Sequence, residues 1–197
     1  MPERFTCGLV LAAGGSTRFG SPKQLLPYDG GTLLGHVLAR ARECRFDQLI
    51  VVLGGAANEV AAGVDLAGAE VVVNAAYGEG CSSSIAAALG AVDPRCEVLV
   101  LLLADQPGVG SPAVAALLDG LGEAPIAVCR YDDGRGHPLA VARSLFGELA
   151  ALHGDRGVWR LLGAQGESAV EVPVAGAMPP DVDTPEDYER VLAAARS

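Results

Sequence analysis

Short apolar runs alternate with longer segments of helical character along most of the chain. The apolar runs are rich in Val, Ile and Leu, as buried parallel strands usually are. They predict strands at residues 6–11, 48–53, 69–74, 97–103 and 125–130. The segments between them predict helices at residues 33–44, 82–92 and 111–121. This alternation favours parallel strands joined by right-handed crossovers, so we expect a Rossmann-like three-layer α/β/α sandwich with a mostly parallel sheet.

The alternation changes after residue 130. The sequence D-D-G-R-G at residues 132–136 predicts a turn, and the apolar residues 139–141 predict a hairpin partner or an edge strand. Further elements are expected as helices at residues 144–152, 157–162 and 185–195 and as a strand at residues 168–174. No segment has the composition of a linker, so we expect a single domain over residues 1–197.

Polar residues mark the expected helix starts. Ser82 and Ser111 are expected as N-caps, with Pro112 at the first helical position of its helix. For the last helix, either Thr184 or Asp183 is the expected cap. Capping alone therefore explains part of the polar pattern at these positions.

Composition indicates a soluble cytoplasmic protein. Half of the residues are hydrophobic, but they lie in runs well below the roughly 20 apolar residues needed to span a bilayer. The first residues do not combine a basic region with a long apolar one, so no secretory leader is expected. The five cysteines are scattered without a C-x-x-C pair, which favours reduced thiols.

The net charge limits the possible partners. A formal charge of −10 disfavours a broad nucleic-acid surface. It is compatible with a mononucleotide, because that ligand needs only a local positive field and acidic side chains can reach phosphate through a divalent cation. We expect no nucleic-acid or membrane partner, and a monomer by default.

A glycine-rich segment follows the first strand and reads L-A-A-G-G-S-T-R-F-G-S-P-K from Leu11 to Lys23. Glycines at the end of a buried strand let backbone N–H groups approach phosphate oxygens, and the loop also carries the cations Arg18 and Lys23. The segment is not a Walker A loop, because Ser21 stands where the lysine is required. It is not a dinucleotide fingerprint either, because its glycines have the wrong spacing. The segment predicts a triphosphate site.

Carboxylates follow two other elements. Asp105 ends the apolar run 99–104, where the carboxyl ends of parallel strands line the ligand crevice, although an aspartate before proline also suits a plain turn. Asp181 and Asp183 precede the last helix. Carboxylates from distant segments suit a hard octahedral cation that also takes phosphate oxygens. The second ligand beside Asp105 is expected to be Asp183, with Asp181 as the alternative.

Five motifs in order resemble the molybdenum cofactor cytidylyltransferases, which belong to the MobA-like nucleotidyltransferases. They are the loop at residues 11–23, L-L-A-D-Q-P at 102–107, G-H-P at 136–138, G-D-x-G at 154–157 and D-V-D-T-P-E-D-Y at 181–188. The resemblance implies a fold of the nucleotide-diphospho-sugar transferase type. It also implies Mg²⁺-dependent transfer of CMP from CTP to the terminal phosphate of molybdenum-bearing molybdopterin, with release of pyrophosphate.

The resemblance also assigns residues. It implies Arg18, Lys23 and Asp105 as catalytic residues, and Asp105 and Asp183 as ligands of Mg²⁺. The implied nucleotide contacts are Leu11, Ala12, Ala13, Gly14, Gly15, Ser16, Arg18, Lys23, Asn74 and Ser82. His137 in G-H-P lies where the family meets the pterin, although a lone histidine is more often structural. A molybdenum hydroxylase is the implied recipient of the product.

Several other functions remain compatible with the sequence. The resemblance to cytidine enzymes rests on Asp183 and on the G-H-P segment. The guanylyl relatives tend to have asparagine at the position of Asp183 and to lack the G-H-P segment. The same chemistry also suits another phosphorylated acceptor, such as a sugar phosphate. An oxidoreductase is disfavoured by the missing dinucleotide fingerprint and the unpaired cysteines. A non-catalytic cofactor-delivery protein would not need both metal carboxylates.

Overall fold

The core of the protein is a 7-stranded sheet with the strand order β5-β4-β1-β6-β8-β7-β9. The computed structural model describes residues 4–16 and 19–195 of the chain. The sheet strands are β1 (Thr6–Ala12), β4 (Gln48–Leu53), β5 (Glu70–Val73), β6 (Val98–Leu103), β7 (Ile126–Tyr131), β8 (Gly134–Ala142) and β9 (Ala169–Pro173). All neighbouring pairs are parallel except those of β8 with β6 and β7.

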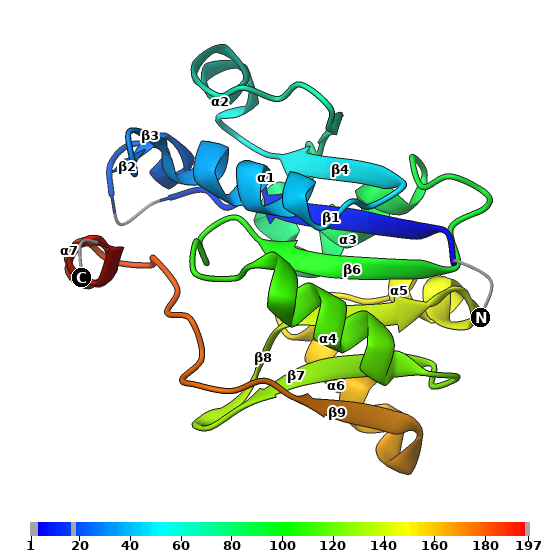
Figure 1. Cartoon of the computed structure of the whole chain (residues 1–197). Coiled ribbons are helices and arrows are strands. Elements are labelled where there is room, and N and C mark those ends of the chain that lie inside the picture. The colour runs from blue at the N-terminus through cyan, green and yellow to red at the C-terminus, as the bar shows by residue number, and fades with distance from the viewer. Residues whose placement is uncertain (1–3, 17–18, 196–197) are drawn as a thin grey trace.

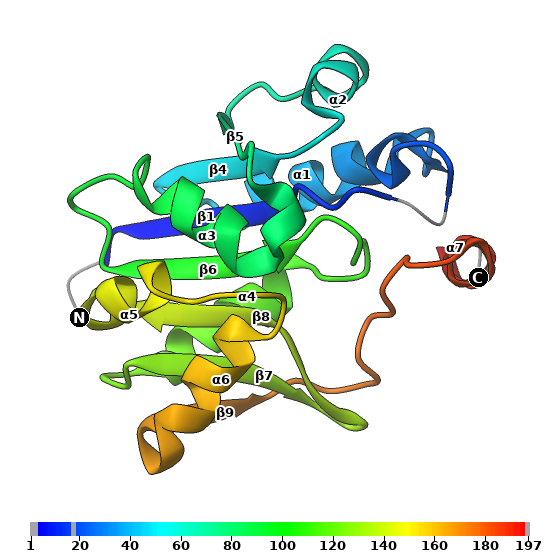
Figure 2. The same ribbon diagram turned by 180° about the vertical axis from the view of Figure 1, so that it is seen from behind.

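Helices cover both faces of this sheet (Figures 1 and 2). The described helices are α1 (Leu33–Glu43), α2 (Ala57–Gly63), α3 (Cys81–Leu89), α4 (Ser111–Leu121), α5 (Phe146–Ala150), α6 (Gly157–Ala164) and α7 (Pro185–Ala195). Alternate strand residues face opposite sides. Val10 therefore packs in the core under α1 and α4, while Leu9 packs in the core under α3, α5 and α6. The expected three-layer sandwich with a mostly parallel sheet is confirmed.

The strand β8 occupies a position that the sequence left open. It follows β7 through a tight turn and pairs with it as an antiparallel hairpin, as one of the two alternatives predicted. The other alternative, an edge strand, is wrong, because β8 also pairs with β6 and so lies inside the sheet. Its burial on both sides explains why Leu139, Ala140 and Val141 are fully buried.

Some local expectations need correction. The helix α3 begins one residue earlier than expected, with Gly80 as its N-cap, and α4 begins at Ser111 with Gly110 as its N-cap. Ser82 and Ser111 are therefore helical residues and not caps. Thr184 does bond the start of α7, since its Oγ1 accepts from the N–H of Asp187 at 3.2 Å.

A few short elements were not predicted. They are α2 and the two-stranded sheet of β2 (Pro27–Tyr28) and β3 (Gly31–Thr32). The β2–β3 pair lies beyond the C-terminal end of β1, and α7 lies on the same side of the molecule (Figure 1). Tyr28, Leu33, Val182 and Val191 form a small core between them. This core brings the C-terminal segment back to the end of the sheet where β1 and β6 stop.

Within the described residues, no helix has both the length and the apolar character needed to cross a membrane.

Candidate functional site

A cavity of about 1010 Å³ opens at the C-terminal ends of β1 and β6. Its walls come from the glycine-rich segment, from the ends of β1 and β6, from the start of α3, from the turn before α6 and from the segment before α7. Its volume is at the upper end of typical ligand pockets. Among the expected site residues, those that line it are Leu11, Ala12, Ala13, Gly14, Gly15, Lys23, Asp105, His137 and Asp183.

The glycine-rich segment folds back on itself. Ser16 adopts a left-handed conformation with φ of 49°, and its Oγ accepts a hydrogen bond of 2.9 Å from the backbone N–H of Lys23. The end of β4 approaches closely, since a Cβ on Gly54 would lie 2.2 Å from the carbonyl oxygen of Ala13. Arg18 lies outside the described residues, so its expected role stays a prediction.

Lys23 joins the two expected metal ligands. Its Nζ lies 2.6 Å from Asp105 Oδ2 and 3.0 Å from Asp183 Oδ1, and it donates a third bond to the carbonyl of Val182. Burial acts to lower the pKa of the Lys23 ammonium, but the ion pairs with Asp105 and Asp183 together outweigh it, so the pKa is raised above its usual value. Lys23 is therefore a fixed cation, with 14% of its side chain exposed.

Three carboxylates lie at this end of the cavity, those of Asp105, Asp181 and Asp183. Burial, together with the nearby charges of Asp105 and Asp183, raises the pKa of Asp181 to about 6. Asp105 Oδ1 is buried and has no hydrogen-bond partner among the described residues. A buried carboxylate oxygen without a hydrogen-bond partner is suited to bind a cation.

These residues fit a divalent cation whose remaining ligands are water and substrate phosphates. Across the described ranges 4–16 and 19–195, no group of three or more His, Cys, Asp or Glu side chains is arranged to hold a metal alone. Mg²⁺ is usually bound by one or two carboxylates together with water and substrate phosphates. Asp105 would hold it here together with Asp183 or Asp181, both of which line the cavity, and the choice between the two stays a prediction.

Asn74 and Ser82 do not line the cavity. Both amide hydrogens of Asn74 are used, because Nδ2 donates to Ser83 Oγ at 2.9 Å and to Ser84 Oγ at 3.1 Å. Ser82 Oγ donates to the carbonyl of Gly154 at 2.6 Å. These bonds hold α3 against neighbouring segments, and direct contact of either residue with a nucleotide stays a prediction. The serine that reaches the cavity is Ser84.

His137 lies in the cavity wall with only 8% of its surface exposed. Burial lowers the pKa of its imidazole to about 4, so it is neutral at physiological pH. Trp159 packs edge-on against it at 5.5 Å between ring centroids. Trp159 packs against buried side chains of the core and also lines the cavity.

The burial of His137 predicts a pH dependence of stability. The unfolded chain binds a proton near pH 6.5 and the folded chain near pH 4, so the free energy of unfolding falls as the pH drops through this window. The difference corresponds to about 3 kcal/mol. We expect urea unfolding to show that His137→Gln destabilises the protein less at acidic pH than at neutral pH. An equal destabilisation at both pH values would contradict a neutral buried histidine.

Sequence reasoning missed several residues of the cavity, namely Gln24, Tyr77, Cys81, Ser84, Asp155 and Arg156. The G-D-R-G segment stands among the motifs of the sequence, but the motif alone assigns no role to its side chains. Asp155 Oδ1 accepts from the N–H of Cys81 at 3.0 Å, which fixes this segment to the start of α3. Arg156, the next residue, contributes a cation to the cavity wall.

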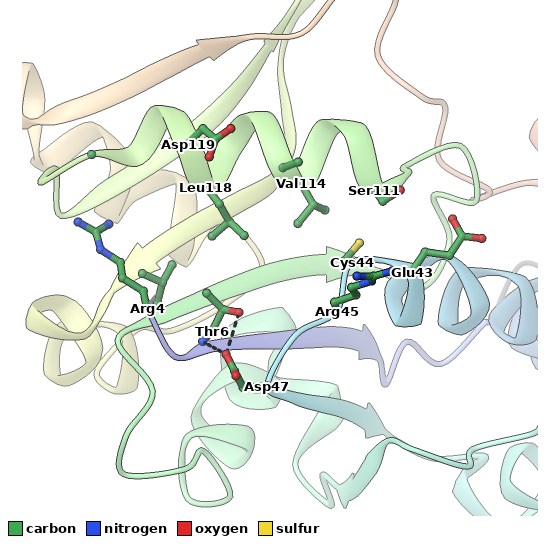
Figure 3. Close-up of a pocket in the computed structure, with 13 residues that line it drawn as sticks. Arg4, Thr6, Glu43, Cys44, Arg45, Asp47, Ser111, Val114, Leu118 and Asp119 are labelled. Atoms are coloured by element: carbon green, nitrogen blue, oxygen red, sulfur yellow. Dashed lines mark hydrogen bonds between the residues drawn. The ribbon is translucent and has the colours of Figure 1, made fainter. Parts of the chain in front are cut away.

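A second cavity of about 600 Å³ runs along α4 at the opposite end of the sheet (Figure 3). Several of its polar side chains are already paired. Asp47 Oδ2 accepts from the N–H of Thr6 at 2.7 Å, and Arg4 forms an ion pair with Glu123 at 2.9 Å. This cavity contains none of the expected site residues.

The chain is similar in sequence and in fold to several known proteins. Residues 8–170 match the family of MobA-like NTP transferase domains. The crystal structure of a homologue of Mycobacterium tuberculosis Rv0371c, from Mycobacterium sp. strain JC1, is 53% identical with a TM-score of 0.91 and covers 97% of this chain and 96% of that one. Rv0371c of M. tuberculosis H37Rv in complex with manganese is 46% identical, has a TM-score of 0.86 and covers 96% of this chain and 98% of that one. The nicotine blue oxidoreductase of Paenarthrobacter nicotinovorans is 31% identical over 94% of this chain and 95% of that protein.

Proposed function

Because the chain belongs to the MobA-like NTP transferases, we propose that it is a cytidylyltransferase acting as one domain, which transfers CMP from CTP to the terminal phosphate of molybdenum-bearing molybdopterin. The observation that carries this proposal is the convergence of the glycine-rich segment, Lys23, Asp105 and Asp183 at one cavity. Backbone donors, a fixed cation and carboxylates for a dication are what a triphosphate requires.

The reaction needs little covalent help from the protein. An oxygen of the acceptor phosphate attacks the α-phosphorus of CTP, the bond from that phosphorus to the bridging oxygen breaks, and pyrophosphate leaves. A phosphate monoester is already ionised near neutral pH, so no general base is required. A bound Mg²⁺ would supply positive charge that stabilises the negative charge developing on the leaving pyrophosphate.

The residues of the chain then have distinct tasks. Lys23 holds a full positive charge beside the carboxylates, where it neutralises charge on the triphosphate. The backbone of residues 12–15 faces the same cavity and is suited to donate to phosphate oxygens. The manganese complex of Rv0371c supports a divalent cation, and we propose Mg²⁺ as the metal for this chain.

Ser84 is proposed to contact the base. It lies in the cavity wall and accepts a hydrogen bond from Asn74, so its own hydroxyl hydrogen remains for donation. Cytosine presents two acceptors, O2 and N3, to such a donor. Asn74 and Ser82 act in this arrangement by holding α3, which carries Ser84.

Arg156 is proposed to bind the acceptor phosphate, while His137 and Trp159 shape the apolar part of the acceptor site. Arg156→Gln is expected to raise the KM for the acceptor about tenfold, since a charge-assisted hydrogen bond contributes about 1.5–3 kcal/mol. The KM for CTP should stay unchanged. Steady-state kinetics with each substrate varied in turn make the measurement, with Arg135→Gln on the exposed hairpin as the control. An equal rise in both KM values would contradict this assignment.

The acceptor is tested by product analysis. Purified protein, CTP and Mg²⁺ are incubated with molybdenum-bearing molybdopterin or with sugar 1-phosphates, and the masses of the products are compared. A CMP adduct of the pterin alone supports the proposal, and a CMP adduct of a sugar phosphate would replace the acceptor.

The absorption spectrum of the purified protein tests whether it is an oxidoreductase, because a bound flavin would be visible. Transfer of the cytidylylated pterin from the purified protein to a molybdenum hydroxylase would identify that enzyme as the recipient of the product.

A further inference from the structure

Gln24 is a buried polar residue that the reaction described above does not use. It belongs to the 3₁₀ turn Lys23–Leu25, directly after the charged lysine, and only 3% of its surface is exposed. A buried amide normally satisfies its donors and its acceptor. Gln24 does so entirely within the glycine-rich segment.

Both hydrogens of the Gln24 amide go to backbone carbonyls of this segment. Nε2 donates to the carbonyl of Ala12 at 2.7 Å and to that of Gly14 at 3.1 Å. The peptide unit is planar and trans, so its carbonyl and its N–H point in opposite directions. The N–H groups of Ala13 and Gly15 therefore point away from Gln24, and both residues line the cavity.

The amide oxygen of Gln24 closes the other side of the segment. It accepts a hydrogen bond of 3.2 Å from Ser16 Oγ, and this hydroxyl oxygen accepts in turn from the N–H of Lys23. Ser16 has a left-handed backbone that is unfavourable for a residue with a side chain and needs support from its surroundings. Gln24 and Ser16 thus form one clasp across the loop.

We propose that Gln24 is a positioning residue, which fixes the peptide planes of the glycine-rich segment so that their N–H groups, and not their carbonyls, face the triphosphate. This role rests on the proposed nucleotidyltransferase function. A peptide that turns over would present a carbonyl oxygen to an anionic phosphate, and preorganised donors lose their advantage when they must reorient. The clasp acts on nucleotide affinity, while contact with the acceptor is unaffected.

The test compares two glutamines that each donate two hydrogen bonds through Nε2. Gln48 also donates twice through Nε2, to Glu70 and to the carbonyl of Ala91, but it lies at the start of β4, away from the cavity. Calorimetric titration with CTP and Mg²⁺, and thermal unfolding, are measured for wild type, Gln24→Met and Gln48→Met. Gln24→Met is expected to weaken CTP binding about tenfold to a hundredfold, from the loss of two hydrogen bonds. Gln48→Met is expected to lower the Tm while leaving CTP affinity unchanged.

Gln24→Asn is the second variant, for the case that Gln24→Met does not fold. Its shorter amide keeps the chemistry but cannot span both carbonyls, so CTP affinity should again fall. Wild-type affinity in a folded Gln24 variant, or equal losses in Gln24→Met and Gln48→Met, would overturn the positioning role. Failure of the wild type to bind any nucleoside triphosphate would instead overturn the proposed function and, with it, this role.

Discussion

Asp105→Asn is expected to abolish nucleotidyl transfer while the protein remains folded. The substitution removes the negative charge of one of the two carboxylates that contact Lys23 and leaves only one of its two side-chain oxygens to bind a metal. A metal ion contributes several kcal/mol to charge stabilisation in a transition state, and each 1.36 kcal/mol is tenfold in rate, so turnover should fall by about three orders of magnitude. The fold should persist, because the backbone carbonyl of Asp105 still accepts from the N–H of Val182 at 2.9 Å.

Two further measurements separate a metal-binding role of Asp105 from a purely structural one. Electron paramagnetic resonance of Mn²⁺ should report weaker binding to Asp105→Asn than to wild type, independently of turnover. Asp119→Asn makes the same change of charge at the cavity along α4 and should leave both quantities unchanged. Turnover of Asp105→Asn close to that of wild type would remove Asp105 from the metal site.

Lys23→Met is expected to have the second largest effect. The variant loses the cation that Asp105 and Asp183 share, so their charges repel one another and the incoming triphosphate. Loss of a positioned electrostatic group costs about a hundredfold to a thousandfold in kcat. The affinity for CTP should fall as well, because Lys23 is charged both before and during the reaction.

The stability of Lys23→Met provides an independent readout. Without Mg²⁺, its Tm should lie below that of wild type, because a partly buried ion pair has lost one partner. Addition of Mg²⁺ should raise the Tm of Lys23→Met by more than it raises the Tm of wild type, because the dication neutralises the carboxylates that have lost Lys23. Arg95→Met removes a cation from the exposed pair with Asp93 and should show neither effect. A Lys23→Met enzyme with wild-type kcat would contradict the role of Lys23.

Where the sequence carried a strong local signal, it predicted the fold well. Strand 48–53 and helices 111–121 and 185–195 match the structure at both ends, because a glycine or a proline marks at least one end of each. The position of β8 was not predictable, since its pairing with β6 depends on a partner about forty residues earlier in the chain. The capping role expected of Ser82 was wrong because the carbonyl of Gly154, 72 residues away, captures its hydroxyl.

Some features of the candidate site could likewise be predicted from local sequence, and others depend on distant contacts. The rule that ligands bind at the carboxyl ends of parallel strands was enough to bring Asp105 to the glycine-rich segment. The arrival of Asp183 depends on α7 docking beside the β2–β3 pair through Val182 and Val191, and neither of those short strands was predicted. The contribution of Gln24 was hidden for another reason, because its bonds run to backbone carbonyls that no sequence motif records.

The most direct test of the account measures pyrophosphate release by the wild-type protein with Mg²⁺ and molybdenum-bearing molybdopterin, with CTP, GTP, ATP and UTP in parallel. We expect release that depends on CTP and on the pterin together, and we expect both Asp105→Asn and Lys23→Met to lose this release. Release with GTP in place of CTP would contradict the assignment of the base while keeping the chemistry of the site. No release with any of the four nucleotides would contradict the central claim that this cavity transfers a nucleotidyl group to the pterin.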